Sequence, residues 1–120
     1  MTLDEARKCI AEVQKEYPEL DAHGLQRFDK EDRKIGIHPQ EFIYVVEWLL
    51  NYDSFDRRRT IYTGASSYGW KHTVERDIKE YISNGAFICA ALYLKYKMKQ
   101  IPNSPNAYFN LRKDTRHALR

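Results

Sequence analysis

The segment 39–52 constrains the fold more than any other part of this 120-residue chain. It begins with Pro39, and proline is favoured at the first position of a helix because its missing N–H costs no hydrogen bond there. The residues that follow give the segment a broad apolar face, which is typical of a helix at the centre of a core. That face consists of Phe42, Ile43, Val45, Val46, Trp48, Leu49 and Leu50.

A second helix is predicted at the N-terminus. Thr2 and Glu5 have the spacing of a capping box, in which each side chain accepts a hydrogen bond from the backbone N–H of the other residue. Apolar residues then recur every three or four positions until Pro18, which cannot continue a helix.

Two more helices are predicted in the second half of the chain. Adjacent serines are suited to cap a helix over 67–79, and Ser83 is suited to cap a fourth helix over 84–99. Their short polar connection makes them a helix-turn-helix-like pair. The strict DNA-binding pattern is not met, because Tyr81 stands where that motif has a small residue.

A short two-stranded β element is expected beside the helices. Residues 61–63 support a short strand or an extended linker, and 107–111 alternate well enough for a strand that pairs with them. At 42% hydrophobic and 31% charged residues, the composition lies in the range of folded proteins. The sequence therefore predicts a mainly α fold, a compact bundle of about four helices in a single domain over 1–120.

The charge on the chain is divided by position. Residues 1–56 hold 13 acidic and 7 basic side chains, whereas residues 57–120 hold 4 acidic and 13 basic ones. The first half is therefore acidic, and the second half is basic and rich in aromatic rings. Because Lys and Arg neutralise phosphates and flat rings stack on bases, the basic half favours DNA or RNA as a partner.

The candidate contacts to nucleic acid or to an acidic partner are basic, aromatic and helix-capping residues of the basic half. They are Arg57, Arg58, Arg59, Tyr68, Lys71, His72, Asn84, Lys95, Tyr96, Lys97 and Lys99. On the predicted helix, Lys71 and His72 share an exposed surface with Glu75, which orients them. Tyr68 or Tyr96 is expected to stack on bases if the strand is single.

Each of these groups also has an explanation that needs no partner. The three lysines near the end of the predicted 84–99 helix complement its dipole. Lys71 with Glu75 is an ordinary pair on a helix surface, and the residues at 83–85 make a plain N-cap as readily as an anion site. The 57–59 arginines either clamp a phosphate or pair with the acidic half of the same chain.

No pattern in the sequence predicts a metal, a cofactor or a reaction. His72 and Glu75 have a spacing suited to two metal ligands or to an acid–base pair, but the other histidines fall in no ligand pattern. Neither a nucleophile motif nor a phosphate-loop motif is present. Cys9 and Cys89 lie far apart outside any CxxC pair, which favours two buried free thiols.

Several strings in the second half resemble a pattern found in small uncharacterised proteins of phages and plasmids. They are Ser67-Tyr68, Lys71-His72, Glu75, the run from Tyr81 to Ala91, and the run from Asn103 to Ala107. The resemblance falls within residues 67–111 and implies a mobile-element origin. Such elements carry repressors and replication accessories, and also small proteins that block host defence enzymes by binding them.

These observations support three functional hypotheses. The first is a small non-enzymatic protein that binds nucleic acid through its basic half. The second is an inhibitor or accessory factor that binds an acidic surface of a protein target, and the third is an enzyme centred on His72 and Glu75. Without a secretory signal or an apolar run long enough to span a membrane, the chain is expected to be cytoplasmic, with no membrane partner.

Overall fold

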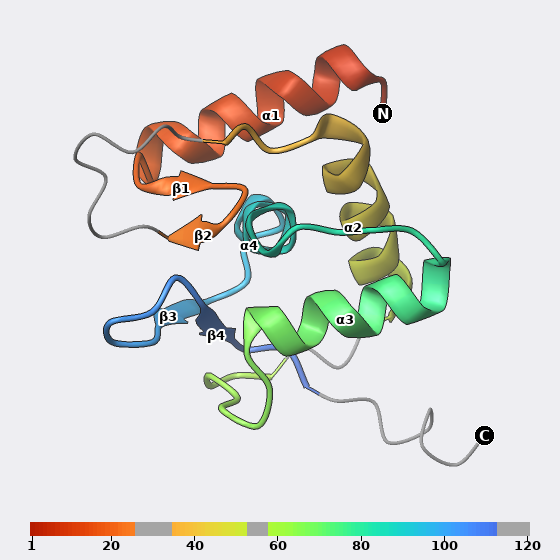
Figure 1. The fold of residues 1–120 in the computed structure, drawn as a ribbon. Coiled ribbons are helices and arrows are strands. Elements are labelled where there is room, and N and C mark those ends of the chain that lie inside the picture. Colours follow the sequence, from red (N-terminus) through yellow and green to blue (C-terminus); the bar gives the residue numbers. More distant parts are fainter. Residues whose placement is uncertain (26–34, 53–57, 113–120) are drawn as a thin grey trace.

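The computed structural model describes residues 1–25, 35–52 and 58–112. These ranges form a compact, mainly helical globule with four helices and two small two-stranded antiparallel sheets, which confirms the predicted fold class (Figure 1). Arg57 and the basic tail at 113–120 lie outside the described residues. The elements are α1 (Leu3–Glu16), β1 (Leu20–Asp21), β2 (Gly24–Leu25), α2 (Pro39–Tyr52), α3 (Ser67–Ile78), α4 (Asn84–Tyr93), β3 (Met98–Gln100) and β4 (Ala107–Phe109).

The predicted helix starts are confirmed. Thr2 Oγ1 accepts a hydrogen bond from the Glu5 N–H (3.1 Å), and the Glu5 carboxylate accepts one from the Thr2 N–H (2.7 Å). Ser66 and Ser83 cap α3 and α4, each through a side-chain oxygen that accepts from the backbone N–H three residues later. Helix α2 spans the predicted 39–52.

Helix α4 lies at the centre of the fold and is buried on all sides. Every residue from Asn84 to Leu92 is buried, as expected of a helix that is apolar around its whole circumference. Figure 1 shows α4 between α1 and α3, with α2 beside it, and all three helices pack against it. The apolar face predicted for 39–52 is buried in the core except for Leu50, which is 53% exposed, but α4 rather than α2 is the helix buried on all sides.

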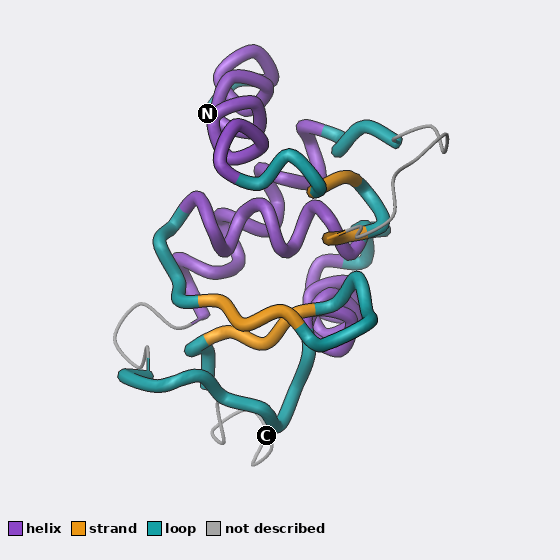
Figure 2. The backbone as a smooth tube through the Cα atoms, turned by 90° about the vertical axis from the view of Figure 1, so that its left-hand side faces the viewer, coloured by secondary structure: helices purple, strands orange, loops and turns teal. Residues whose placement is uncertain are grey.

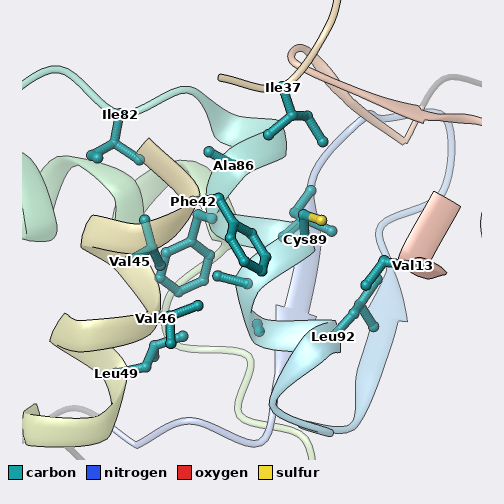
Figure 3. Close-up of a cluster of buried hydrophobic side chains, with 14 of the residues drawn as sticks. Val13, Ile37, Phe42, Val45, Val46, Leu49, Ile82, Ala86, Cys89 and Leu92 are labelled. Carbon is teal, nitrogen blue, oxygen red and sulfur yellow. The ribbon is translucent and has the colours of Figure 1, made fainter. Parts of the chain in front are cut away.

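The side chains between α2 and α4 form the main core. Figure 3 shows this cluster, which Val13 of α1 and Ile82 also join. The rings of Phe42 and Tyr93 meet edge-to-face with centroids 5.4 Å apart. Burial raises the pKa of the Cys89 thiol, and the prediction of a buried free thiol is confirmed there, whereas Cys9 is only half-buried.

Helix α4 ends at Tyr93, earlier than the predicted 84–99 helix. Lys95 has a left-handed backbone with φ of 70°, and its N–H donates to a carbonyl of the last helical turn (2.9 Å). The chain reverses there and continues as β3, in which Lys99 lies opposite Tyr108 of β4. Lys95 therefore lies at the C-terminal end of α4, where the helix dipole favours a cation, whereas Lys97 and Lys99 lie beyond the helix and the dipole does not explain them.

The predicted β element is present in part. Tyr62 forms an isolated antiparallel bridge to Phe109, and its N–H donates to the Phe109 carbonyl (2.9 Å). The full strand partner of β4 is β3, a segment for which the sequence predicted a helix. The pairing of 61–63 with 107–111 is thus reduced to one bridge beside a hairpin.

A second hairpin, which the sequence did not predict, joins the start of α4. Strands β1 and β2 pair with Asp21 opposite Gly24, whose φ of +126° suits glycine at this reversal. The carbonyl of Ala22 accepts a hydrogen bond from the Gly85 N–H (2.9 Å). Figures 1 and 2 show α1 at one end of the molecule and the β3–β4 hairpin at the other.

We predict that Gly85→Ala destabilises the fold by about 1–3 kcal/mol, because small-to-large changes in a packed core force atoms apart. A Cβ at Gly85 would overlap the Asp21 carbonyl and lie 2.8 Å from the Ala22 Cα. Urea unfolding measures the change. Gly69→Ala is the matched control: nothing lies within 4 Å of its Cβ, and alanine in a helix should stabilise α3 by about 0.5–1 kcal/mol. Equal effects at the two sites would contradict the prediction.

Candidate nucleic-acid interface

The outer face of the β3–β4 hairpin carries basic and aromatic side chains. Successive side chains of a strand point to opposite faces. Ala107 and Phe109 are fully buried and face the core, so Tyr108 between them faces outward. Lys99 lies opposite Tyr108, and Lys97 shares its face two residues earlier. Both lysines are exposed.

Asn110, which follows β4 and is only 3% exposed, joins the 58–59 segment to this hairpin. Its Oδ1 accepts a hydrogen bond from the Lys97 N–H (2.7 Å), and its Nδ2 donates to the Arg58 carbonyl (2.8 Å). The Arg58 N–H donates in turn to the Asn110 carbonyl (3.0 Å). One buried side-chain amide therefore links the backbones of Arg58 and Lys97.

Two side-chain contacts complete the arrangement. Lys97 Nζ donates to the Arg59 carbonyl (2.9 Å), and the Arg58 guanidinium carbon lies 5.2 Å from the centroid of the Tyr62 ring, a cation–π geometry. We call Arg58, Arg59, Lys97 and Lys99 the basic sheet surface. All four side chains are exposed, and none forms an ion pair within the described ranges.

Helix α1 does not neutralise the basic sheet surface. The two lie at opposite ends of the molecule (Figures 1 and 2). The ion pairs of α1 are made within the helix, between Arg7 and Asp4 (2.9 Å) and between Lys15 and Glu12 (3.6 Å). The acidic side chains of α1 therefore lie far from the cations of the basic sheet surface.

Lys71 is buried at 6% exposure, so the expectation that its side chain lies on an exposed surface is wrong. Its Nζ donates to Glu75 Oε2 (3.0 Å) and to the Ile82 carbonyl (2.9 Å). The Ile82 N–H donates to the same Glu75 oxygen (3.0 Å). The pair thus satisfies both backbone groups of Ile82 and fixes the connection from α3 to α4.

His72 completes this network at the surface, where its Nδ1 lies 2.9 Å from Glu75 Oε1. Burial raises the pKa of Glu75, but the hydrogen bonds from the Ile82 N–H, Lys71 and His72 outweigh it, and the pKa lies below its usual value. Both oxygens of this carboxylate are engaged in holding the fold. Neither His72 nor Glu75 lines the cavity beside Lys71, and an enzyme centred on them stays a prediction.

Two other predicted contacts are buried. Tyr96 is 5% exposed and Asn84 is 7% exposed. The Tyr96 ring lies in the core and offers no face for stacking, whereas Tyr68 is 51% exposed and Lys95 is exposed. Helices α3 and α4 do form the predicted helix-turn-helix-like pair. Because α4 is buried on all sides, however, this pair presents no recognition helix to DNA.

A cavity of about 330 Å³ lies beside Lys71. It opens between α3, the α3–α4 connection, the β1–β2 turn and the loop that joins β3 to β4, and its lining is Ala22, His23, Tyr68, Lys71, Tyr81, Asn84, Pro105 and Asn106. Sequence reasoning selected Tyr68, Lys71 and Asn84 but missed Asn106 and the linking role of Asn110. An asparagine in a loop or after a strand is too common to be a signal by itself, and only tertiary pairing reveals its partners.

Within the described part of the chain, no three His, Cys, Asp or Glu residues gather to hold a metal ion. The helices in those ranges are too short or too polar for any of them to cross a membrane. Comparison of the chain with family models, with curated proteins and with solved structures finds no match.

We predict that Glu75→Gln lowers the free energy of unfolding at neutral pH by about 1.5–3 kcal/mol, because Lys71 loses its charged acceptor. The pKa of the Glu75 carboxyl is lower in the folded state than its value of 4.5 in the unfolded state. The ionised carboxyl therefore stabilises the fold fully above pH 4.5, and this stabilisation is lost as the pH falls through the folded-state pKa. The difference between wild type and variant should therefore shrink below pH 4.5.

Urea unfolding at a series of pH values, from neutral to well below 4.5, follows the loss of this stabilisation. Glu80→Gln, at an exposed position of the α3–α4 connection, is the control and should change stability little throughout. A deficit in Glu75→Gln that stays constant with pH would show that the ionised carboxylate is not the stabilising group.

We also predict that Asn110→Ala loosens the basic sheet surface, since it removes the acceptor of the Lys97 N–H and the donor to the Arg58 carbonyl. Leaving these part-buried groups unpaired should cost about 1 kcal/mol of stability and speed hydrogen exchange at the Lys97 amide. Asn51→Ala, at an exposed position of α2, should leave that exchange rate unchanged. Equal protection of Lys97 in all three proteins would refute the linking role of Asn110.

Proposed function

We propose that this chain binds single-stranded nucleic acid through the basic sheet surface. The observation that carries the proposal is the grouping of four exposed cations that have no carboxylate partner in the described ranges. Cations held close together attract a polyanion, and each phosphate that they neutralise releases condensed counterions.

The cations are organised before any partner arrives. Asn110 links the backbones that carry Arg58 and Lys97, and Lys97 Nζ contacts the backbone of Arg59. Groups that are already ordered lose less conformational entropy on binding. The same contacts bring the 58–59 segment and Lys97, which are far apart in the sequence, to one surface.

Two features favour a single strand over a duplex. The burial of α4 leaves the helix-turn-helix-like pair without a helix to enter a major groove. The rings of Tyr62 and Tyr108 are half-exposed on the elements that carry the cations. Aromatic rings stack on unpaired bases, whose faces a duplex hides.

The protein-binding inhibitor predicted from the sequence would use the same cations against an acidic target. A mobile-element origin, which the sequence resemblance implies, is compatible with either partner. The two partners differ in a measurable way, because only the nucleic-acid proposal requires that a purified oligonucleotide binds the purified chain.

Binding to a single strand should weaken steeply with salt. The slope of log affinity against log salt is about −0.7 for each neutralised phosphate, so four contacts give about −3. Replacing Lys97 and Lys99 together by alanine should make the slope shallower by about 1.4 and weaken binding about 25-fold at 0.1 M salt by the same relation. Fluorescence anisotropy of a labelled oligonucleotide measures both quantities.

The control replaces Lys8 and Lys15 of α1 by alanine, which removes the same charge from the opposite end of the molecule. Its salt slope should stay close to that of the wild type. Equal weakening by both double variants would show that net charge, not this surface, attracts the strand. An absence of binding at low salt would overturn the proposal, and recovery of one specific acidic protein would then favour the inhibitor.

A further inference from the structure

The cavity beside Lys71 has the size of a small-ligand site, at about 330 Å³. It is built from four separate stretches of the chain. Lys71 and Asn84 are its buried polar members, and Tyr68 and Tyr81 are its exposed aromatic members. This combination of two rings with a few buried polar groups is what a specific site for a flat, polar ligand requires.

Lys71 makes the cavity unsuited to a bare anion. Its charge is already balanced by Glu75, with Nζ and Oε2 3.0 Å apart, and a second of its three N–H donors is used on the Ile82 carbonyl. The third N–H has no hydrogen-bond acceptor among the described residues and lies near the Tyr68 and Tyr81 rings. A neutral acceptor such as a ring carbonyl matches that remaining donor without adding an uncompensated charge to a buried site.

Both tyrosine rings lie close to the same ammonium group. The distance from Lys71 Nζ to the ring centroid is 4.8 Å for Tyr81 and 5.6 Å for Tyr68. The Tyr68 ring also meets His72 edge-to-face with centroids 4.6 Å apart, which restricts its orientation. Tyr81 is 66% exposed, so its ring is free to cover a flat ligand that enters the cavity.

Two amides add a hydrogen-bond acceptor and a donor. Asn84 uses its Nδ2 on the His23 carbonyl (2.8 Å) and on Asn106 Oδ1 (2.9 Å), while its buried Oδ1 accepts from no residue of the described ranges. The Asn106 Nδ2 likewise donates to none of the described residues. Together with the third N–H of Lys71, these amides therefore give the cavity two donor groups and one acceptor group that have no hydrogen-bond partner among the described residues.

We infer that this cavity takes a uracil or thymine base from the strand that the basic sheet surface holds. The imide edge of these bases presents carbonyl, N–H and carbonyl groups in order, which is the complement of two donors and one acceptor. Cytosine has the same ring size but carries an amino group and lacks the imide N–H. The inference rests on the proposed function and adds base preference to it.

The cavity is joined to the basic sheet surface through the hairpin. Asn106 immediately precedes β4, and the Ala107 N–H donates to Ser67 Oγ at the start of α3 (3.1 Å), next to Tyr68. Lys99 and Tyr108 lie on the two strands of the same hairpin. A strand bound along the hairpin therefore passes the loop that forms one wall of the cavity.

The test compares three strands of equal length, one with thymine only, one with cytosine only and one without bases. All three carry the same phosphates, so the basic sheet surface contributes equally to each. The wild type should bind the thymine strand about tenfold more tightly than the cytosine strand, the discrimination expected of one specific set of hydrogen bonds. Tyr81→Ala should remove most of that preference and leave binding of the strand without bases intact.

Two further variants sharpen the result. Tyr81→Phe keeps the ring and should keep the thymine preference, which separates stacking from the loss of the hydroxyl group. Leu50→Ala, at an exposed position of α2 outside the cavity, should leave all three affinities unchanged. In NMR titrations the side-chain amide of Asn106 should shift with the thymine strand and not with the cytosine strand.

The possible failures are distinguishable. Equal affinity for the thymine and cytosine strands would overturn the inference and leave the proposed function in place. A thymine preference that survives Tyr81→Ala would assign it to another site. If no strand binds at low salt, the proposed function fails and the base preference fails with it.

Discussion

The complete burial of α4 is the constraint on which the rest of the structure depends. A helix that is apolar on every side must be covered on every side, and α1, α2 and α3 supply that cover. Its N-terminus is enclosed as well. Ser83 caps the helix, and the β1–β2 turn packs directly against Gly85, where a side chain would not fit. The Lys71–Glu75 pair then fixes the chain that leads into it.

This burial also decides which surfaces are left for function. With α4 inside, the chain after Lys95 turns out of the core and forms a hairpin whose outer face carries Lys97 and Lys99. Asn110 brings Arg58 to the same hairpin by hydrogen bonds to backbone groups from both segments. The acidic helix α1 lies at the opposite end of the molecule from this basic surface.

The parts of the fold that could be predicted are those that depend on residues close together in the sequence. The cap at Thr2, the proline-led helix at 39–52 and the cap at Ser83 depend on residues within a few positions, and the structure confirms them. The prediction that the helix continues over residues 94–99 was wrong, because the apolar residues of this segment fit either a helix or a strand. The positive φ of Lys95 and the pairing partner in β4 decide between the two, and neither is visible in the local pattern.

The sequence by itself determined the helical class, most helix boundaries and the uneven distribution of charge, because periodicity, capping and composition are properties of neighbouring residues. Only the tertiary structure decided which of the described cations are buried and which are exposed. It buried Lys71 against Glu75, and it gathered Arg58 and Lys97 around Asn110. The physical reason is that burial and pairing depend on contacts between segments distant in the chain, whose partners a one-dimensional pattern does not specify.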